Sequence, residues 1–364
     1  MILAIIPFAS VESIVFNATA FRELVSGRRR GIGAAVLRGL LRFAEFFYTA
    51  VVRWRNWRYD RGAAATHRVG ATVVSVGNLT LGGTGKTPLV QWIAEWFRSR
   101  GVRVAVVSRG YGAAETGTEN DEARQLRWLL PDVPHVENPD RVAAAGEAVR
   151  AFNSQVIVLD DAFQHRRIAR DLDIVLLDAL EPFGFGHVFP RGTLREPIEG
   201  LRRADVVVLT RADLIEPNER DEVWRTVRRR VPTAVCAEAI HAPRELISAD
   251  GKKMPLETIR GQSVAAFCGI GSPAGFRHTL EACGCRVASF REFPDHHRYT
   301  PKDVDLFAKW LDDLDVSTVL CTCKDLVKLQ VERIGSRPLW GVRIEMEFRT
   351  GKEPLEARLQ MLIE

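Results

Sequence analysis

The chain has 364 residues, 46% hydrophobic and 27% charged, so it is too apolar for a disordered protein and long enough for two packed domains. Its formal net charge of +5 suits an anionic partner such as a nucleotide, a phospholipid surface or a nucleic acid, without choosing among them. Six cysteines are too few for a disulfide scaffold, which favours a reducing compartment. Their C-x-C pairs lack the C-x-x-C spacing usual for zinc, so we expect ordinary thiols.

The first sixty residues predict an amphipathic helix. Residues 1–16 are apolar but carry Glu12 and lack a basic start, so they resemble neither a signal peptide nor a membrane span. Further on, a polar stripe recurs at steps of three and four: Arg38, Arg42, Glu45, Thr49, Arg53 and Asn56. The opposite side is apolar: Val36, Leu37, Leu40, Leu41, Phe43, Phe47, Val51 and Trp54. This apolar face packs on its own domain, as in most amphipathic helices, or binds a membrane surface, which would suit the arginines and the flanking Trp57 and Tyr59. Both can hold at once, and the sequence pattern alone leaves the two alternatives open.

From residue 71 the pattern changes to short β-branched runs separated by helical stretches. The runs are ATVVSV, RVAVVS, QVIVLD, LDIVLLD and ADVVVLT. Strands that are apolar on both faces and separated by crossover-length segments predict a mostly parallel sheet covered by helices on both sides.

A glycine-rich loop, GNLTLGGTGKTPLV at residues 77–90, follows the first of these strands. Its glycines allow backbone N–H groups to surround phosphate oxygens, Lys86 can reach the outer phosphates, and Thr87 can bind Mg²⁺. The strict P-loop pattern has glycine where this chain has Thr80. We expect these residues to contact the nucleotide phosphates: Thr80, Gly82, Gly83, Thr84, Gly85, Lys86 and Thr87.

Two further strand ends complete the expected nucleotide site. The strand VIVLD ends in Asp160 and is followed by Asp161, which resembles a Walker B element whose carboxylates hold Mg²⁺ directly or through water. The strand VVVLT is followed by Arg211, where guanine-specific enzymes carry a lysine. We therefore favour ATP over GTP.

A second α/β pattern begins after residue 236. We expect an N-terminal extension with the amphipathic helix at 1–62, a P-loop nucleotide-binding domain at 63–236, a smaller α/β domain at 237–342, and a C-terminal segment at 343–364 that returns to the first domain. Two functions remain open on these features alone. They are a P-loop switch or metallochaperone ATPase, and a membrane-anchored binding protein without chemistry.

Several short motifs occur in one order along the chain: the P-loop, SRGYG (108–112), the acidic pair Asp121 and Glu122, the pair Asp140 and Arg141, DDAFQHRRIARDLDIVLLD (160–178), LREP (194–197), FPDHHRYT (293–300) and CTCKDLVKL (321–329). Together they resemble the tetraacyldisaccharide 4'-kinase family. The resemblance covers nearly the whole chain after its first few dozen residues.

The resemblance implies an enzyme that uses ATP and Mg²⁺ to phosphorylate the 4'-hydroxyl of the lipid A disaccharide precursor, at the cytoplasmic face of a bacterial inner membrane. It implies catalytic roles for Lys86 and for an aspartate–histidine pair, Asp121 and His296, which we expect to be completed by closure between the two domains. It adds Glu196 to the Mg²⁺ site. It also implies that four residues meet the acceptor: Arg141, Gln164, His165 and Arg195.

Overall fold

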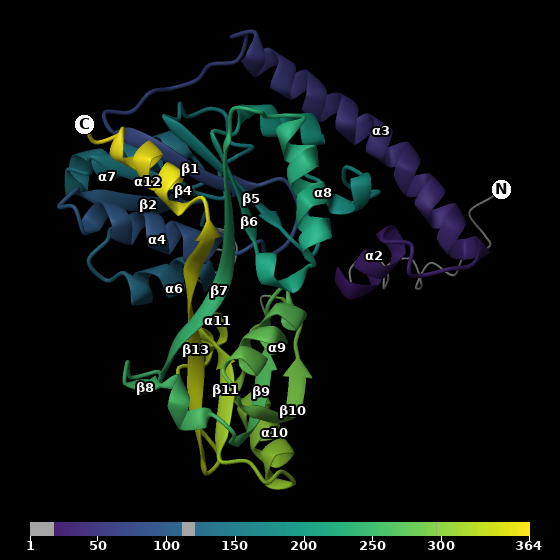
Figure 1. The fold of residues 1–364 in the computed structure, drawn as a ribbon, viewed down its shortest axis with the longest axis vertical. Coiled ribbons are helices and arrows are strands. Elements are labelled where there is room, and N and C mark those ends of the chain that lie inside the picture. Colours follow the sequence, from purple (N-terminus) through teal and green to yellow (C-terminus); the bar gives the residue numbers. More distant parts are fainter. Residues whose placement is uncertain (1–17, 111–120, 296) are drawn as a thin grey trace.

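The computed structural model describes residues 18–110, 121–295 and 297–364. Its strands are β1 (Thr72–Asn78), β2 (Val104–Ser108), β3 (His135–Glu137), β4 (Val156–Asp160), β5 (Leu172–Asp178), β6 (Val206–Thr210), β7 (Val235–Ile247), β8 (Lys253–Pro255), β9 (Ser263–Cys268), β10 (Arg286–Glu292), β11 (Thr318–Thr322), β12 (Arg333–Ile334) and β13 (Arg337–Thr350). Its α-helices are α2 (Ala18–Val25), α3 (Ile32–Asp60), α4 (Lys86–Arg98), α6 (Asp121–Leu129), α7 (Arg141–Phe152), α8 (Pro217–Arg228), α9 (Pro273–Ala282), α10 (Pro301–Asp312), α11 (Cys323–Leu329) and α12 (Lys352–Gln360). The strands form one sheet in the order β10-β9-β11-β13-β7-β6-β5-β1-β4-β2-β3, to which β12 and β8 are attached (Figure 1).

The nucleotide lobe is a parallel sheet between two helical layers, as the β-branched runs predict. Alternate side chains of β1 show the two faces: Val74 and Val76 pack with α4, α6 and α12, whereas Val73 packs with α7. Helix α8 covers the same face as α7, over β5 and β6. Strand β1 pairs with β4 and β5, so the segments that follow β1 and β4 emerge side by side at the carboxyl edge. The α/β fold class is confirmed.

The smaller lobe holds β9, β10 and β11 with α9, α10 and α11, and two long strands connect it to the first lobe. Strands β7 and β13 pair in antiparallel fashion from Glu238↔Thr350 to Ile247↔Gly341, and Figure 1 shows both strands running through the two lobes. The expected limits at 236/237 and 342/343 fall inside these strands. After β13 the chain returns to the first lobe, where Leu355 and Leu359 of α12 are fully buried. We keep the division at these limits as a proposal.

Part of the polar stripe of helix α3 faces the protein. Glu45 is buried and accepts a hydrogen bond from the backbone N–H of Val188 at 2.8 Å, and Asn56 donates to Glu196 at 2.8 Å, whereas Arg42 and Arg53 are exposed. The apolar side is largely exposed, with exposed fractions of 50–68% for Val36, Leu40, Phe43, Phe47, Val51 and Trp54. Packing of this face on its own domain is therefore not what the structure shows.

None of the helices in the described ranges is both long and apolar enough to cross a bilayer.

Candidate active site

The P-loop connects β1 to α4 at the carboxyl edge of the sheet. Gly82 and Gly85 have φ angles of +109° and +81°, which side-chain-bearing residues adopt at a cost. A Cβ on Gly85 would also collide with the imidazole of His241 on β7. Thr80, which replaces the usual glycine, is buried, and its carbonyl accepts a hydrogen bond from Asn78 Nδ2 at 2.7 Å. The variant loop is therefore held in shape by side chains of neighbouring strands.

Residues at the end of β6 support the loop from the other side. The Thr210 hydroxyl donates to the carbonyl of Thr84 at 2.9 Å, and Arg211 Nη2 donates to the carbonyl of Gly83 at 3.1 Å. Arg211 also forms an ion pair with Asp178 at the end of β5. In the sequence Arg211 argues only against guanine, whereas in the structure it supports the P-loop. Burial, together with Arg211, lowers the pKa of His241 to about 3, so this ring is neutral.

The lysine and the two aspartates lie together. Lys86 Nζ is 3.4 Å from Asn78 Oδ1 and 3.5 Å from Asp161 Oδ1. Arg195 Nη1 is 2.8 Å and 2.9 Å from the two carboxylate oxygens of Asp161. Burial alone would raise the pKa of Asp161, but Lys86 and Arg195 outweigh it, and the pKa lies below its usual value. Asp161 is thus an ionised carboxylate that already has cationic partners.

Asp160 has a different environment. Burial raises its pKa to about 6, with Asp161 and Glu122 acting in the same direction and Lys86 and Arg141 opposing them. Its Oδ1 atom is buried and has no hydrogen-bond partner in the part of the chain that the structure describes. A buried, unpartnered carboxylate oxygen next to a P-loop is the kind of ligand that Mg²⁺ prefers. Asp160 therefore fits a metal ligand better than Asp161 does.

Glu196 is bound by three neighbouring side chains. Within residues 18–110, 121–295 and 297–364, no three His, Cys, Asp or Glu side chains are grouped as a metal site would require. Glu196 is fully buried, and its carboxylate binds Arg203 at 2.8 Å, Asn56 at 2.8 Å and Gln164 at 3.0 Å. Its carboxylate oxygens therefore accept from three donors, and through Asn56 and Gln164 they connect α3 to the loop after β4. Its role at the Mg²⁺ site stays a prediction.

The four expected acceptor residues lie around the end of β4. Arg141, at the start of α7, is 2% exposed and donates to the carbonyl of Asp160 at 3.4 Å. Gln164 donates to the carbonyl of Asn78 at 2.9 Å, and Arg195 holds Asp161. Burial and the neighbouring arginines lower the pKa of His165 to about 4, and its Nε2 atom is buried without a partner among the described residues. His165 is thus a neutral imidazole with an unused ring nitrogen.

Asp121 begins α6 and is held by the smaller lobe. Lys328 of α11 is 3.0 Å from its carboxylate, and Lys324 is 2.9 Å from Glu122 and 3.2 Å from Asp295. Lys328 is in turn 3.9 Å from the fully buried Asp325. Two lysines one helical turn apart therefore fasten α6 to the other lobe. The expected partner of Asp121, His296, lies outside the described residues.

The supporting roles of Arg211, His241 and the two lysines of α11 were not predictable from the sequence patterns. His241 lies in the middle of strand β7, and no sequence motif around it indicates a contact with the P-loop. Lys324 and Lys328 share one face of α11, which could have indicated a paired acidic helix, but the sequence does not say which one.

Comparisons with known proteins identify the family. The family described as tetraacyldisaccharide-1-P 4'-kinase matches residues 37–364. The chain is 41% identical over 337 residues to the tetraacyldisaccharide 4'-kinase of Anaeromyxobacter sp. (strain K), covering 88% of this chain and 89% of the relative. It is 36% identical over 351 residues to the corresponding protein of Halothermothrix orenii, covering 89% and 90%.

A solved structure agrees. The "apo" form of LpxK from Aquifex aeolicus in complex with ATP has a TM-score of 0.71 and 28% identity, and the match covers 90% of this chain and 100% of that one. With a family match over most of its length, this chain belongs to the tetraacyldisaccharide-1-P 4'-kinase family.

Proposed function

We propose that this protein transfers the γ-phosphate of ATP to the 4'-hydroxyl of a tetraacyldisaccharide 1-phosphate, the lipid A precursor, and so forms the bisphosphorylated lipid. The observation that carries this proposal is the combination of a P-loop and the adjacent Asp160 with a family match over residues 37–364. A P-loop switch or metallochaperone ATPase would need only the first of these.

The P-loop residues bind the nucleotide in this proposal. Backbone N–H groups of residues 82–87 surround the phosphates, and Lys86 neutralises their outer oxygens. Asp160 and Thr87 would hold Mg²⁺, with Asp161 close by. The ion supplies charge neutralisation between the phosphates. The contacts of Arg211 and Thr210 with the loop carbonyls keep it preorganised, so that less of the binding free energy is spent on ordering it.

Asp121 is the proposed acceptor of the hydroxyl proton, together with His296. Its placement at the first turn of α6, held by Lys328, fixes the carboxylate between the two lobes. A general base of this kind typically contributes ~10²–10⁴ in rate. Loss of Asp121 should therefore reduce turnover and leave ATP affinity nearly unchanged.

The acceptor sugar is proposed to bind near Arg141, Gln164, His165 and Arg195. His165 carries the clearest structural support, because its buried Nε2 lacks a partner among the described residues and can bond a sugar hydroxyl. Arg195 would bridge the acceptor region to Asp161. These side chains lie around the end of β4, and the P-loop follows the neighbouring strand β1.

Helix α3 is proposed to bind the membrane in which the substrate lies. Its exposed side carries Phe43, Phe46 and Trp54, each 58–69% exposed, while part of its polar stripe is bound to the protein. Amphipathic helices with exposed aromatic and apolar residues lie in the plane of a lipid surface. We propose a peripheral or monotopic attachment at the cytoplasmic face of the bacterial inner membrane, with no role for nucleic acid.

A transfer assay tests the proposed reaction. The protein is incubated with labelled ATP, Mg²⁺ and the lipid A disaccharide 1-phosphate, and labelled bisphosphorylated lipid is separated from free phosphate. We expect label in the lipid for the wild type and none for Lys86→Ala. The exposed Lys309→Ala serves as the control because it removes a lysine far from the P-loop in sequence. Label found only as free phosphate, with the acceptor present, would instead support the switch ATPase.

A further inference from the structure

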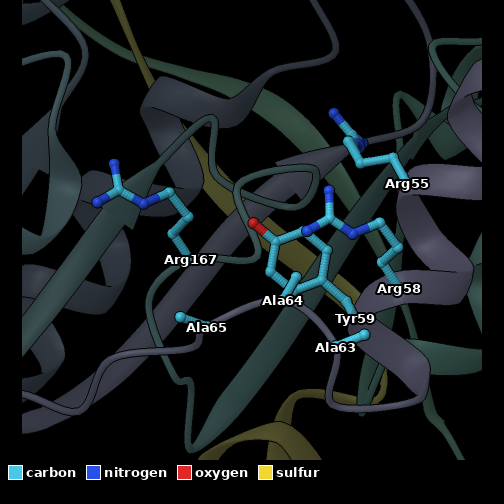
Figure 2. A pocket seen from close by; sticks show the side chains of 7 residues that line it. All are labelled: Arg55, Arg58, Tyr59, Ala63, Ala64, Ala65 and Arg167. Atoms are coloured by element: carbon cyan, nitrogen blue, oxygen red, sulfur yellow. The ribbon is translucent and has the colours of Figure 1, made fainter.

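A cavity of about 260 Å³ lies between the end of α3 and the loop that leads into β5. It is lined by Arg55, Arg58, Tyr59, Ala63, Ala64, Ala65 and Arg167. In Figure 2, Arg55 and Arg167 lie on opposite sides of this cavity, with Arg58 and Tyr59 between them and the three alanines along its floor. The lining therefore combines three guanidinium groups with small side chains, and it contains no carboxylate.

The charges of this cavity are only partly compensated. Asp60, the acidic residue that ends α3, is bound to Arg166 at 2.8 Å, and Asp140 is 3.5 Å from Arg167. Neither Arg55 nor Arg58 has a carboxylate within ion-pair distance among the described residues, and Arg55 Nε is buried without an acceptor there. A buried donor without an acceptor is costly unless a ligand satisfies it. An anion with several acceptor oxygens would therefore complement the guanidinium groups of this lining.

The position of the cavity identifies the source of that anion. Arg58 stacks on Trp54 at 5.1 Å, and Arg61 stacks on Trp57 at 5.1 Å. Both indoles belong to the exposed side of α3, being 58% and 47% exposed. Exposed tryptophans gather at the depth of lipid headgroups. If α3 lies on a membrane as proposed above, Trp54 brings Arg58, which lines the cavity, near the level of the headgroup phosphates.

We propose that this arginine cavity binds the phosphate group of an anionic phospholipid headgroup. Guanidinium groups suit this ligand because each can present two N–H donors to two phosphate oxygens. The inference rests on the proposed membrane contact of α3 and adds to it a specific site for one lipid class. Binding there would fix the rotation of α3 on the surface and hence the direction in which the P-loop faces.

Vesicle binding tests the proposal with the full-length protein. Flotation is measured with neutral phosphatidylcholine vesicles, with vesicles containing phosphatidylglycerol, and with vesicles of equal surface charge made with a fatty acid. We expect the wild type to prefer phosphatidylglycerol over both others. The double variant Arg55→Gln/Arg58→Gln should bind phosphatidylglycerol vesicles about 30-fold more weakly. Arg167→Gln should weaken binding in the same direction.

A matched control separates the cavity from general surface charge. Arg53→Gln/Arg61→Gln removes two exposed arginines from the same part of α3, outside the cavity. In about 0.5 M salt, where diffuse attraction is screened, the control should bind like the wild type and the cavity variants should remain weaker. Equal losses in the two double variants, or equal wild-type binding to fatty-acid vesicles, would overturn the proposal.

The substrate's own phosphate is the other source of the same chemistry. Kinase activity is therefore measured in neutral detergent micelles with the same protein preparations. We expect the KM for the disaccharide 1-phosphate to be unchanged in Arg55→Gln/Arg58→Gln. A raised KM without any lipid preference in flotation would assign the cavity to the substrate and refute the headgroup. An inactive wild type would refute the proposed reaction, whereas an active one that ignores anionic vesicles would refute only the cavity.

Discussion

Lys328 provides a test of how the smaller lobe acts on the reaction. Its ammonium group is 3.0 Å from Asp121 and only 8% exposed, while the Asp121 side chain is 21% exposed. Contacting charged residues in such environments show coupling free energies of about 0.5–3 kcal/mol. Lys328→Met should therefore release the Asp121 carboxylate from its position and lower kcat by about 10–100-fold. The KM for ATP should change by less than about twofold, because the ion pairs of Lys328 are with Asp121 and Asp325 and not with a P-loop residue.

The assay is a double-mutant cycle on kcat with Asp121→Asn. If Lys328 acts through Asp121, Lys328→Met should have almost no further effect in the Asp121→Asn background. Lys328→Arg should recover most of the activity, since it keeps the charge. Lys324→Met is the comparison variant, because it breaks the neighbouring contact with Glu122 and Asp295 while Lys328 remains bound to Asp121. Equal losses from Lys328→Met with and without Asp121 would refute this reasoning.

Three further predictions follow from the nucleotide site. Arg211→Met should weaken ATP binding by about tenfold, because it removes the contact with Gly83 and leaves Asp178 without its partner. Calorimetry measures the affinity, and the exposed Arg225→Met is the control that should leave it unchanged. Glu196→Gln should lower Tm by about 5–10 °C, because the Glu196 carboxylate is bound to Arg203. The Mg²⁺ concentration for half-maximal activity should change by less than about twofold. A higher Mg²⁺ requirement at unchanged Tm would instead assign Glu196 to the metal site. The Mg²⁺ concentration for half-maximal activity should rise as the pH falls below about 6, because Asp160 then gains a proton, and it should stay constant at higher pH. Activity titrated with Mg²⁺ at several pH values measures this.

The strands and the P-loop were predictable from the sequence because their signals are local. Five β-branched runs are apolar on both faces, and each became a buried parallel strand. The loop that follows β1 and the aspartate that ends β4 could be placed together, since parallel strands end at one edge of the sheet.

Pairings over long sequence distances were not predictable in the same way. The contact of Lys328 with Asp121 joins residues from different lobes, and α11 offers no sign of which acidic helix it meets. Glu196 has a similar contact: the sequence predicts an acidic residue near the metal site, but it does not predict the hydrogen bond that Arg203, seven residues later, donates to it. For α3 the spacing of polar and apolar residues indicated two faces, but not which of them meets the protein. A buried carboxylate such as Glu45 requires hydrogen-bond partners that only the fold supplies.

The return of the chain after β13 has a consequence for synthesis. Met346, Leu355 and Leu359 are part of the same core as Val74 and Leu89, so the nucleotide lobe lacks part of its interior until these residues have left the ribosome. The smaller lobe, by contrast, is translated almost completely before that point. A nascent chain that ends near residue 336 should therefore expose an apolar face of the first lobe to chaperones.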